Sequence, residues 1–214
     1  MTRCWLNIIC GGLALLTSNG VEGASVEYTI RFPQAKNHYA DIEMRCDTDG
    51  QQQLELMMPT WTPGSYLIRE YARHVETISA SDTDGGELPV SRSRKNRWIV
   101  NCGDTTSVVV QYRLYCNEMS VRTNQVESDF ALFSGAATFL TPVDARMCQH
   151  QVHVELPNDW KHAVCPLPSV SDDRQTFLAQ DYDELVDSPI LCGNPNIYPF
   201  KVGDREHLLV SIGE

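Results

Sequence analysis

Two histidines spaced three residues apart are the closest approach to a metal site in this 214-residue sequence. His150 and His153 lie in a segment that alternates apolar and polar residues, which predicts a β-strand. Side chains three apart in a strand point to opposite faces, so these two imidazoles cannot hold one ion. No Cys-x-x-Cys pair occurs, which argues against a structural zinc site. We therefore predict no metal ligand and no cofactor in this chain.

An acidic segment near the C-terminus offers carboxylate oxygens. Asp181, Asp183, Glu184 and Asp187 can attract Ca²⁺ or a substrate ammonium group. Their spacing does not match an EF-hand loop, and acidic residues at the start of a short helix stabilise that helix through its dipole. The structural role is favoured for the segment as a whole. Asp183 and Asp187 are kept as candidate contacts for a partner or ligand.

Aromatic residues flank a Pro-Gly pair further upstream. Trp61 and Tyr66 enclose Pro63 and Gly64, a sequence typical of a tight turn. Exposed aromatic side chains on a fixed turn can bind a ligand or partner, whereas buried ones would pack on a sheet. Packing is the favoured role, and both aromatic residues are kept as candidate contacts.

Two arginines follow this turn, one helical turn apart. Arg69 and Arg73 can pair with Glu70 or with the acidic segment, and they can also anchor a substrate carboxylate. The sequence leaves these alternatives open. Nucleophilic catalysis has no support, because Ser188 precedes a proline outside any Gly-x-Ser-x-Gly turn and no cysteine lies in a protease signature.

The overall charge excludes some partners. The formal net charge is −11 and the isoelectric point is near 4.9. Binding to nucleic acid requires clustered Lys and Arg, so we predict no nucleic-acid partner. The same charge disfavours docking on anionic lipid.

The first 23 residues are expected to be a signal peptide. Arg3 supplies a positive start, a short apolar stretch follows, and small or β-branched residues allow cleavage before Ala24. No later segment has eighteen consecutive apolar residues, so no membrane span is expected after signal removal. The protein is therefore predicted to be exported, to the periplasm or the extracellular space.

Signal removal would leave six cysteines: Cys46, Cys102, Cys116, Cys148, Cys165 and Cys192. An even number in an exported chain permits disulfides, and six cysteines allow fifteen pairings. Cys46 continues the inward-facing positions of its strand, which indicates a buried free thiol. Cys102 and Cys116 flank a hairpin whose register would not place them opposite each other.

Alternation with a period of two dominates the rest of the chain. The apolar members of the alternating runs are Val26, Tyr28, Ile30, Phe32, Ala40, Ile42, Met44, Cys46, Leu54, Leu56, Met58, Val108, Val110, Tyr112, Leu114, Val152, Val154 and Leu156. Such runs are typical of half-buried antiparallel strands. We predict one all-β domain over residues 24–214, an antiparallel sandwich or two packed sheets. One or two short helices are expected, over residues 66–75 with Ser65 as N-cap and over residues 181–186.

Two segments are more specific than composition. Residues 59–75 read PTWTPGSYLIREYARHV, and residues 181–189 read DYDELVDSP, with Gly193 close behind. Weaker signals accompany them in the expected order: Pro33 and His38, Arg97-Trp98, and Ser120-Val121-Arg122. Together they resemble the N-terminal domain of peptidase family M61, the glycyl aminopeptidases, over roughly residues 25–214.

The resemblance implies a β-rich domain that precedes a thermolysin-like zinc domain, often with a PDZ domain after it. Family members are expected to remove N-terminal residues such as glycine from peptides. The zinc ligands of the family belong to a His-Glu-x-x-His helix, and none of the six histidines of this chain begins such a sequence. No catalytic residue of the family therefore corresponds to a residue of this chain. The expected partner is a metallopeptidase catalytic domain, which would hold the zinc.

Three functional hypotheses follow. The first is a non-catalytic accessory domain that scaffolds the metallopeptidase or shapes its substrate cleft, which predicts an exposed apolar patch. The alternative is a free-standing exported β-sandwich that binds peptide, carbohydrate or protein, which predicts a concave site lined by aromatic residues. The third, an independent hydrolase, would show robust peptidase turnover with added Zn²⁺ and is the least favoured.

Overall fold

A computed structural model of the protein describes residues 25–62 and 67–213. The predicted signal peptide, the N-cap Ser65 and the candidate contact Tyr66 lie outside these residues. No helix in the described ranges is long and apolar enough to cross a membrane.

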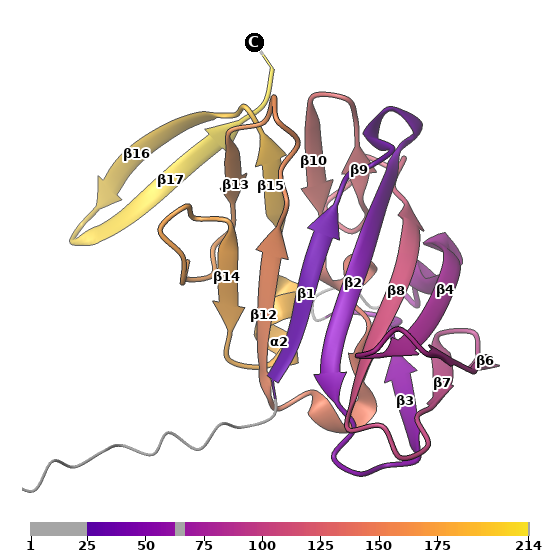
Figure 1. Cartoon of the computed structure of the whole chain (residues 1–214). Coiled ribbons are helices and arrows are strands. Elements are labelled where there is room, and N and C mark those ends of the chain that lie inside the picture. Colours follow the sequence, from indigo (N-terminus) through magenta and orange to yellow (C-terminus); the bar gives the residue numbers. More distant parts are fainter. Residues whose placement is uncertain (1–24, 63–66, 214) are drawn as a thin grey trace, which may run out of the picture.

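A seven-stranded sheet forms the largest layer of the described structure (Figure 1). Its order is β14 (Thr176–Ala179), β12 (Gln149–Val154), β1 (Ser25–Arg31), β2 (Tyr39–Asp47), β8 (Ser107–Tyr115), β4 (Val75–Asp82) and β5 (Glu87–Leu88). Strand β1 lies inside the sheet, where it pairs in parallel with β12 and antiparallel with β2. The other pairs of this sheet are antiparallel.

Smaller sheets complete the described architecture. One has the order β13 (His162–Val164), β15 (Ile190–Gly193), β10 (Phe130–Phe133) and β9 (Gln125–Val126). Another has the order β11 (Thr141–Pro142), β3 (Gln53–Met57), β7 (Arg97–Asn101) and β6 (Val90–Arg94). A hairpin of β16 (Asn196–Val202) and β17 (Arg205–Ser211) is separate from these sheets. The prediction of an all-β fold built from packed sheets is confirmed.

One core joins the seven-stranded sheet to the two four-stranded sheets. The alternation predicted the inward-facing residues correctly: Ile42 and Met44 of β2, Leu56 of β3 and Val110 of β8 are at most 1% exposed. Burying such side chains contributes roughly 1.5–3 kcal/mol each relative to leaving them in water. The predicted positions Phe32 and Leu156 pack against this core while only partly buried.

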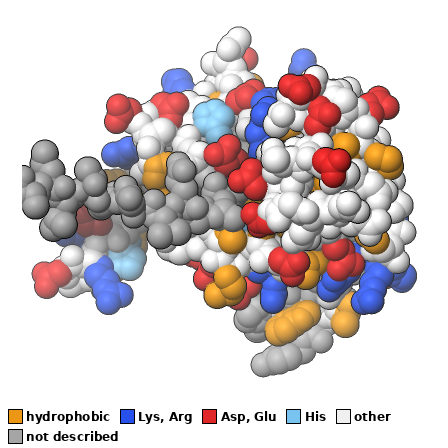
Figure 2. All heavy atoms as spheres, turned by 60° about the horizontal axis from the view of Figure 1, so that its bottom comes forward, with side chains coloured by type: hydrophobic (Ala, Val, Ile, Leu, Met, Phe, Trp, Pro, Cys, Tyr) orange, Lys and Arg blue, Asp and Glu red, His pale blue; other side chains and the backbone are white. Residues whose placement is uncertain are grey.

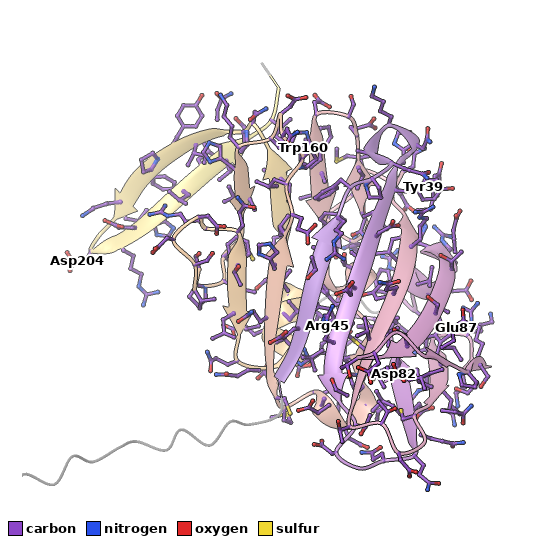
Figure 3. The ribbon with its side chains drawn as sticks, viewed as in Figure 1. Tyr39, Arg45, Asp82, Glu87, Trp160 and Asp204 are labelled. Carbon is purple, nitrogen blue, oxygen red and sulfur yellow. The ribbon has the colours of Figure 1, made fainter. Side chains whose placement is uncertain are left out.

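The outer face of the seven-stranded sheet carries a network of ion pairs. Glu43 accepts hydrogen bonds from Arg31 at 3.0 Å and from Arg45 at 2.9 Å, and Arg113 binds Asp41 through two nitrogens. Arg45 is visible on this face of β2 in Figure 3. Opposite charges on neighbouring strands favour the observed register, so this face has a structural explanation.

The described helices are short. They are α1 (Gly135–Thr138), α2 (Tyr182–Asp187) and the 3-10 helices η1 (Ala35–Asn37), η2 (Tyr71–His74) and η3 (Val143–Ala145). The helix predicted over residues 181–186 is confirmed as α2. The helix predicted over residues 66–75 is wrong except for η2, whose N-cap is Glu70. The amide of Arg69 instead donates to the carbonyl of Thr60 at 2.6 Å, which holds this part of the chain against the preceding segment.

All six cysteines in the described ranges are free thiols. Cys46 is buried, as predicted, and burial raises its pKa to about 12. The same cause raises the pKa of Cys116 to about 12. These thiols therefore stay protonated at neutral pH and behave as small apolar side chains.

His150 of β12 is a fully buried histidine. Its Nε2 lies 3.2 Å from the Ala145 carbonyl and its Nδ1 lies 3.3 Å from the Tyr28 hydroxyl. Burial lowers the pKa of His150 to about 4, although the Ala145 carbonyl and the Asp181 carboxylate act in the opposite direction. His153 points the other way and contacts the Thr176 hydroxyl, so the predicted opposition of the two histidines is confirmed.

Protonation of His150 should make the stability of the domain depend on pH. In the unfolded chain its pKa is near 6.5, so between pH 6.5 and 4 the unfolded state binds a proton that the folded state does not. The free energy of unfolding should therefore decrease as the pH is lowered from 6.5 to 4, by roughly 3 kcal/mol in total. Above pH 6.5, His150 should make no pH-dependent contribution. Urea denaturation at several pH values measures this effect.

The matched control is His150→Gln, which keeps polar atoms at the site and does not titrate. Subtracting its stability profile from that of the wild type removes the contributions of all other ionisable groups. Parallel profiles between pH 7 and pH 5 would contradict the assignment.

Candidate functional site

Helix α2 uses two of its acidic residues for its own start. Asp181 is the N-cap and its side chain accepts a hydrogen bond from the Glu184 amide at 2.8 Å. Glu184 reaches back to the Gln180 amide at 2.7 Å. These reciprocal bonds satisfy amides that have no partner within the helix. The structural role predicted for the acidic segment holds for these two residues, whereas Asp183 and Asp187 are exposed on the outer side of α2.

The close packing of α1 fixes the position of α2. Gly135 in α1 lies against the backbone of α2, where a β-carbon would approach the Leu185 carbonyl oxygen to 2.4 Å and Val186 Cα to 2.8 Å. Such contacts are far shorter than atoms tolerate, so glycine is required here. On the inner side of α2, Tyr182 and Leu185 are fully buried.

A groove runs between α2 and the segment that follows β3, with a volume of about 550 Å³. We call it the α2 groove. It is lined by Met57, Met58, Pro59, Thr60, Trp61, Thr62, Asn96, Arg97, Arg146, Tyr182, Asp183, Val186 and Asp187. The candidate residues Trp61, Asp183 and Asp187, which are distant in the sequence, thus line one depression. The packing role favoured for Trp61 is wrong, because this residue is 54% exposed.

Charges of both signs line the α2 groove. Asp183 and Asp187 are contributed by α2, Arg97 by the start of β7 and Arg146 by the residue after η3. Arg97 also binds Glu55 at 2.7 Å. Acidic and basic side chains are likewise intermingled over the face shown in Figure 2. A groove of this kind can receive a polar chain, with carboxylates available to an ammonium group and guanidinium groups available to carbonyls or carboxylates.

Arg69 and Arg73 lie beside the α2 groove and do not line it. They line an adjacent depression of about 240 Å³, which shares Thr60 and Asn96 with the groove. Arg73 binds Glu118 at 3.0 Å.

Of the alternatives left open for Arg73, the ion pair with Glu70 is not the one observed, because Glu70 binds Lys95 at 2.7 Å. The spacing of one helical turn does not apply here, since residues 67–70 are not helical.

A third depression extends the surface on the other side. It has a volume of about 400 Å³ and shares Thr62, Val186 and Asp187 with the α2 groove. Arg122 of the Ser-Val-Arg signal lines it. The two sequence segments that carry the family resemblance, residues 59–75 and 181–189, therefore meet in space around one surface.

Sequence reasoning missed Arg97 and Arg146 as groove residues. Arg97 belongs to the Arg-Trp signal, which identifies a strand start but not its spatial neighbours. Arg146 follows a short 3-10 helix, and no local pattern marks it.

Metal-ligating side chains do not cluster in the described part of the chain. Within residues 25–62 and 67–213, no group of three or more His, Cys, Asp or Glu side chains is arranged to hold a metal ion.

Replacement of Gly135 by alanine should disturb α2. The new β-carbon would collide with backbone atoms, so α2 must move, with a loss of about 1–3 kcal/mol of stability. Hydrogen exchange of the amides of residues 182–187 should become faster in Gly135→Ala. The control is Gly103→Ala, because Gly103 has open space around it and its φ of +58° imposes only a backbone cost. Unchanged exchange in α2 of Gly135→Ala would contradict the packing argument.

Comparison with known proteins identifies relatives of this fold. The model of the Peptidase M61 N-terminal domain matches residues 27–194. The crystal structure of an aminopeptidase N family protein from Idiomarina loihiensis matches with a TM-score of 0.82 and 28% sequence identity. This match covers 88% of the chain and 32% of the Idiomarina chain, so the protein spans about a third of that relative. The search of curated proteins gave no match.

Proposed function

Because the chain belongs to the peptidase M61 N-terminal domain family, we propose that it is a non-catalytic accessory domain of a zinc aminopeptidase. Its role is to scaffold a metallopeptidase catalytic domain and to form one wall of the substrate cleft. The observation that carries this proposal is the structural match to one third of an aminopeptidase N family chain. The zinc belongs to the catalytic domain, which is the partner.

The exposed surface supports an accessory domain over a free-standing binding module. A free module was expected to have a concave site lined by aromatic residues. The aromatic residues that line the α2 groove are Trp61 and Tyr182, and Tyr182 is buried. An accessory domain was expected to expose apolar side chains, and β16 and β17 expose several of them.

Copurification tests this function. A tagged chain produced in its source cells should retain an aminopeptidase activity that a zinc chelator abolishes. The purified chain alone, supplied with Zn²⁺, should show no turnover of glycyl peptides. Turnover by the chain alone, or the absence of a copurifying peptidase, would refute the proposal.

The α2 groove is proposed to lie along the path of the peptide, where Asp183 and Asp187 attract its N-terminal ammonium group. In the complex of the chain with its peptidase, Asp183→Asn/Asp187→Asn should raise KM about fivefold and leave kcat nearly unchanged. The fivefold change in KM corresponds to a loss of about 1 kcal/mol of binding free energy, which is typical of exposed charge pairs.

A control variant removes a negative charge elsewhere on the domain. Glu87→Gln changes an exposed carboxylate of β5, which forms the edge of the seven-stranded sheet opposite β14, and should leave KM unchanged. If the double variant had the wild-type KM, the proposal that the α2 groove lies along the path of the peptide would be contradicted.

Export to the periplasm or the extracellular space is part of the proposal and rests on residues 1–23. Disulfides give no support for export, since the described cysteines are free thiols. N-terminal sequencing of the protein isolated from its source cells should give Ala24 as the first residue. An intact Met1 would argue against export.

A further inference from the structure

The C-terminal hairpin exposes apolar side chains that the described domain does not cover. In β16, Tyr198 is 54%, Phe200 47% and Val202 59% exposed, and in β17 Leu209 is 59% exposed. The register pairs Tyr198 with Leu209, and residues that pair directly share one face. Alternation along β16 places Phe200 and Val202 on the same side. We call these four residues the hairpin face.

The hairpin extends away from the rest of the molecule. Its two-residue turn, Gly203-Asp204, lies at the end that projects outward, where Asp204 is labelled in Figure 3. Neither strand pairs with a strand of the other described sheets. The opposite side of the hairpin borders a depression of about 680 Å³ through Ile197 and Leu208, so this side faces the domain. The hairpin face is directed away from it.

An isolated two-stranded hairpin is at best marginally stable in water. Soluble monomers rarely expose contiguous apolar patches unless these bind a partner, and open strand edges add a means of backbone pairing. The hairpin face therefore has the chemistry of a surface that another protein covers.

The position of the hairpin in the chain indicates which partner covers the hairpin face. The hairpin begins at Asn196, directly after the family-matched residues 27–194. The Idiomarina relative has a further 68% of its chain that this match does not cover. The hairpin thus lies outside the family-matched residues of a chain whose relative is about three times as long.

The charges of the hairpin face also indicate what kind of partner surface is complementary to it. The basic side chains on this side are Arg205 and His207, which pair with Val202 and Phe200, whereas the chain as a whole has a net charge of −11. His207 stacks on the Phe200 ring with centroids 5.3 Å apart. A complementary surface would be apolar with carboxylates at its rim, and a second copy of this chain offers the same face with the same basic residues.

We propose that the hairpin face is the docking surface for the zinc-peptidase domain. This inference rests on the proposed accessory function and adds the residues that carry the contact. The domain covers Tyr198, Phe200, Val202 and Leu209 with apolar side chains and pairs with the open edge of the hairpin.

Substitution combined with crosslinking tests the docking surface. Phe200→Ser/Leu209→Ser, in the tagged chain produced in its source cells, should reduce the copurified zinc-dependent aminopeptidase activity at least tenfold. Lys201→Ser is the matched control, because it lies on the opposite side of the same hairpin and removes only an exposed ion pair with Glu206. The control should retain wild-type recovery. Thermal unfolding of each purified variant verifies that the domain remains folded.

A photo-crosslinking residue at position 209 should join the chain to a peptide from a polypeptide that contains a His-Glu-x-x-His sequence. The same residue at position 77, on the outer face of the seven-stranded sheet, should not. Equal recovery of activity with the double variant, or crosslinking only at position 77, overturns the docking surface while the accessory function stands. Crosslinks between two copies of the chain also overturn it. Failure of the wild-type chain to recover any peptidase refutes the proposed function itself.

Discussion

Buried tyrosine hydroxyls hold the segment on which the arrangement of the helices depends. Tyr112, Tyr182 and Tyr28 donate hydrogen bonds to the carbonyls of Thr138, Phe139 and Leu140 at 2.9, 2.6 and 2.7 Å. Burial raises the pKa values of these tyrosines, so their hydroxyls remain protonated donors. Carbonyls without a partner in such surroundings would each cost about 1–3 kcal/mol. The tyrosines belong to β8, α2 and β1, so these bonds tie the seven-stranded sheet to both helices.

The position of the candidate site follows from this connection. Tyr182 anchors the inner side of α2, and Gly135 allows α1 to contact the α2 backbone. The outer side of α2 must then present Asp183 and Asp187 toward Trp61. The side chain of Asn124 strengthens the same region, because it donates to the Ala137 carbonyl and accepts from the Ser134 amide. A rigid interior thus supports a charged groove at the surface.

The alternation of residues predicted most of the fold, because burial on one face of a strand is recorded locally. The helix expected over residues 66–75 failed because a backbone bond to Thr60 competes with helical bonding, and such bonds have no local sequence pattern. The meeting of Trp61 with Asp183 and Asp187 was not predictable either. It depends on sheet order and on the packing of Gly135, which only the three-dimensional structure reveals.

Strand β17 reads REHLLVS and does not alternate like the predicted strands. The detachment of the hairpin from the other described sheets was not predictable either, because a strand pattern does not identify its neighbour. The place of Arg146 in the α2 groove was not predictable for the same reason. It depends on the direction that the chain takes after η3, which no local pattern indicates.

The central position of β1 affects the order in which the domain can assemble. Val26 pairs with Cys46 on one side and with His150 on the other, so one neighbour is close in the chain and the other is synthesised far later. Contacts of such long sequence separation slow folding, because a long loop must close first. A nascent chain would therefore keep its first strand half-paired until residue 154 has emerged. The large sheet would therefore close only after most of the chain is available.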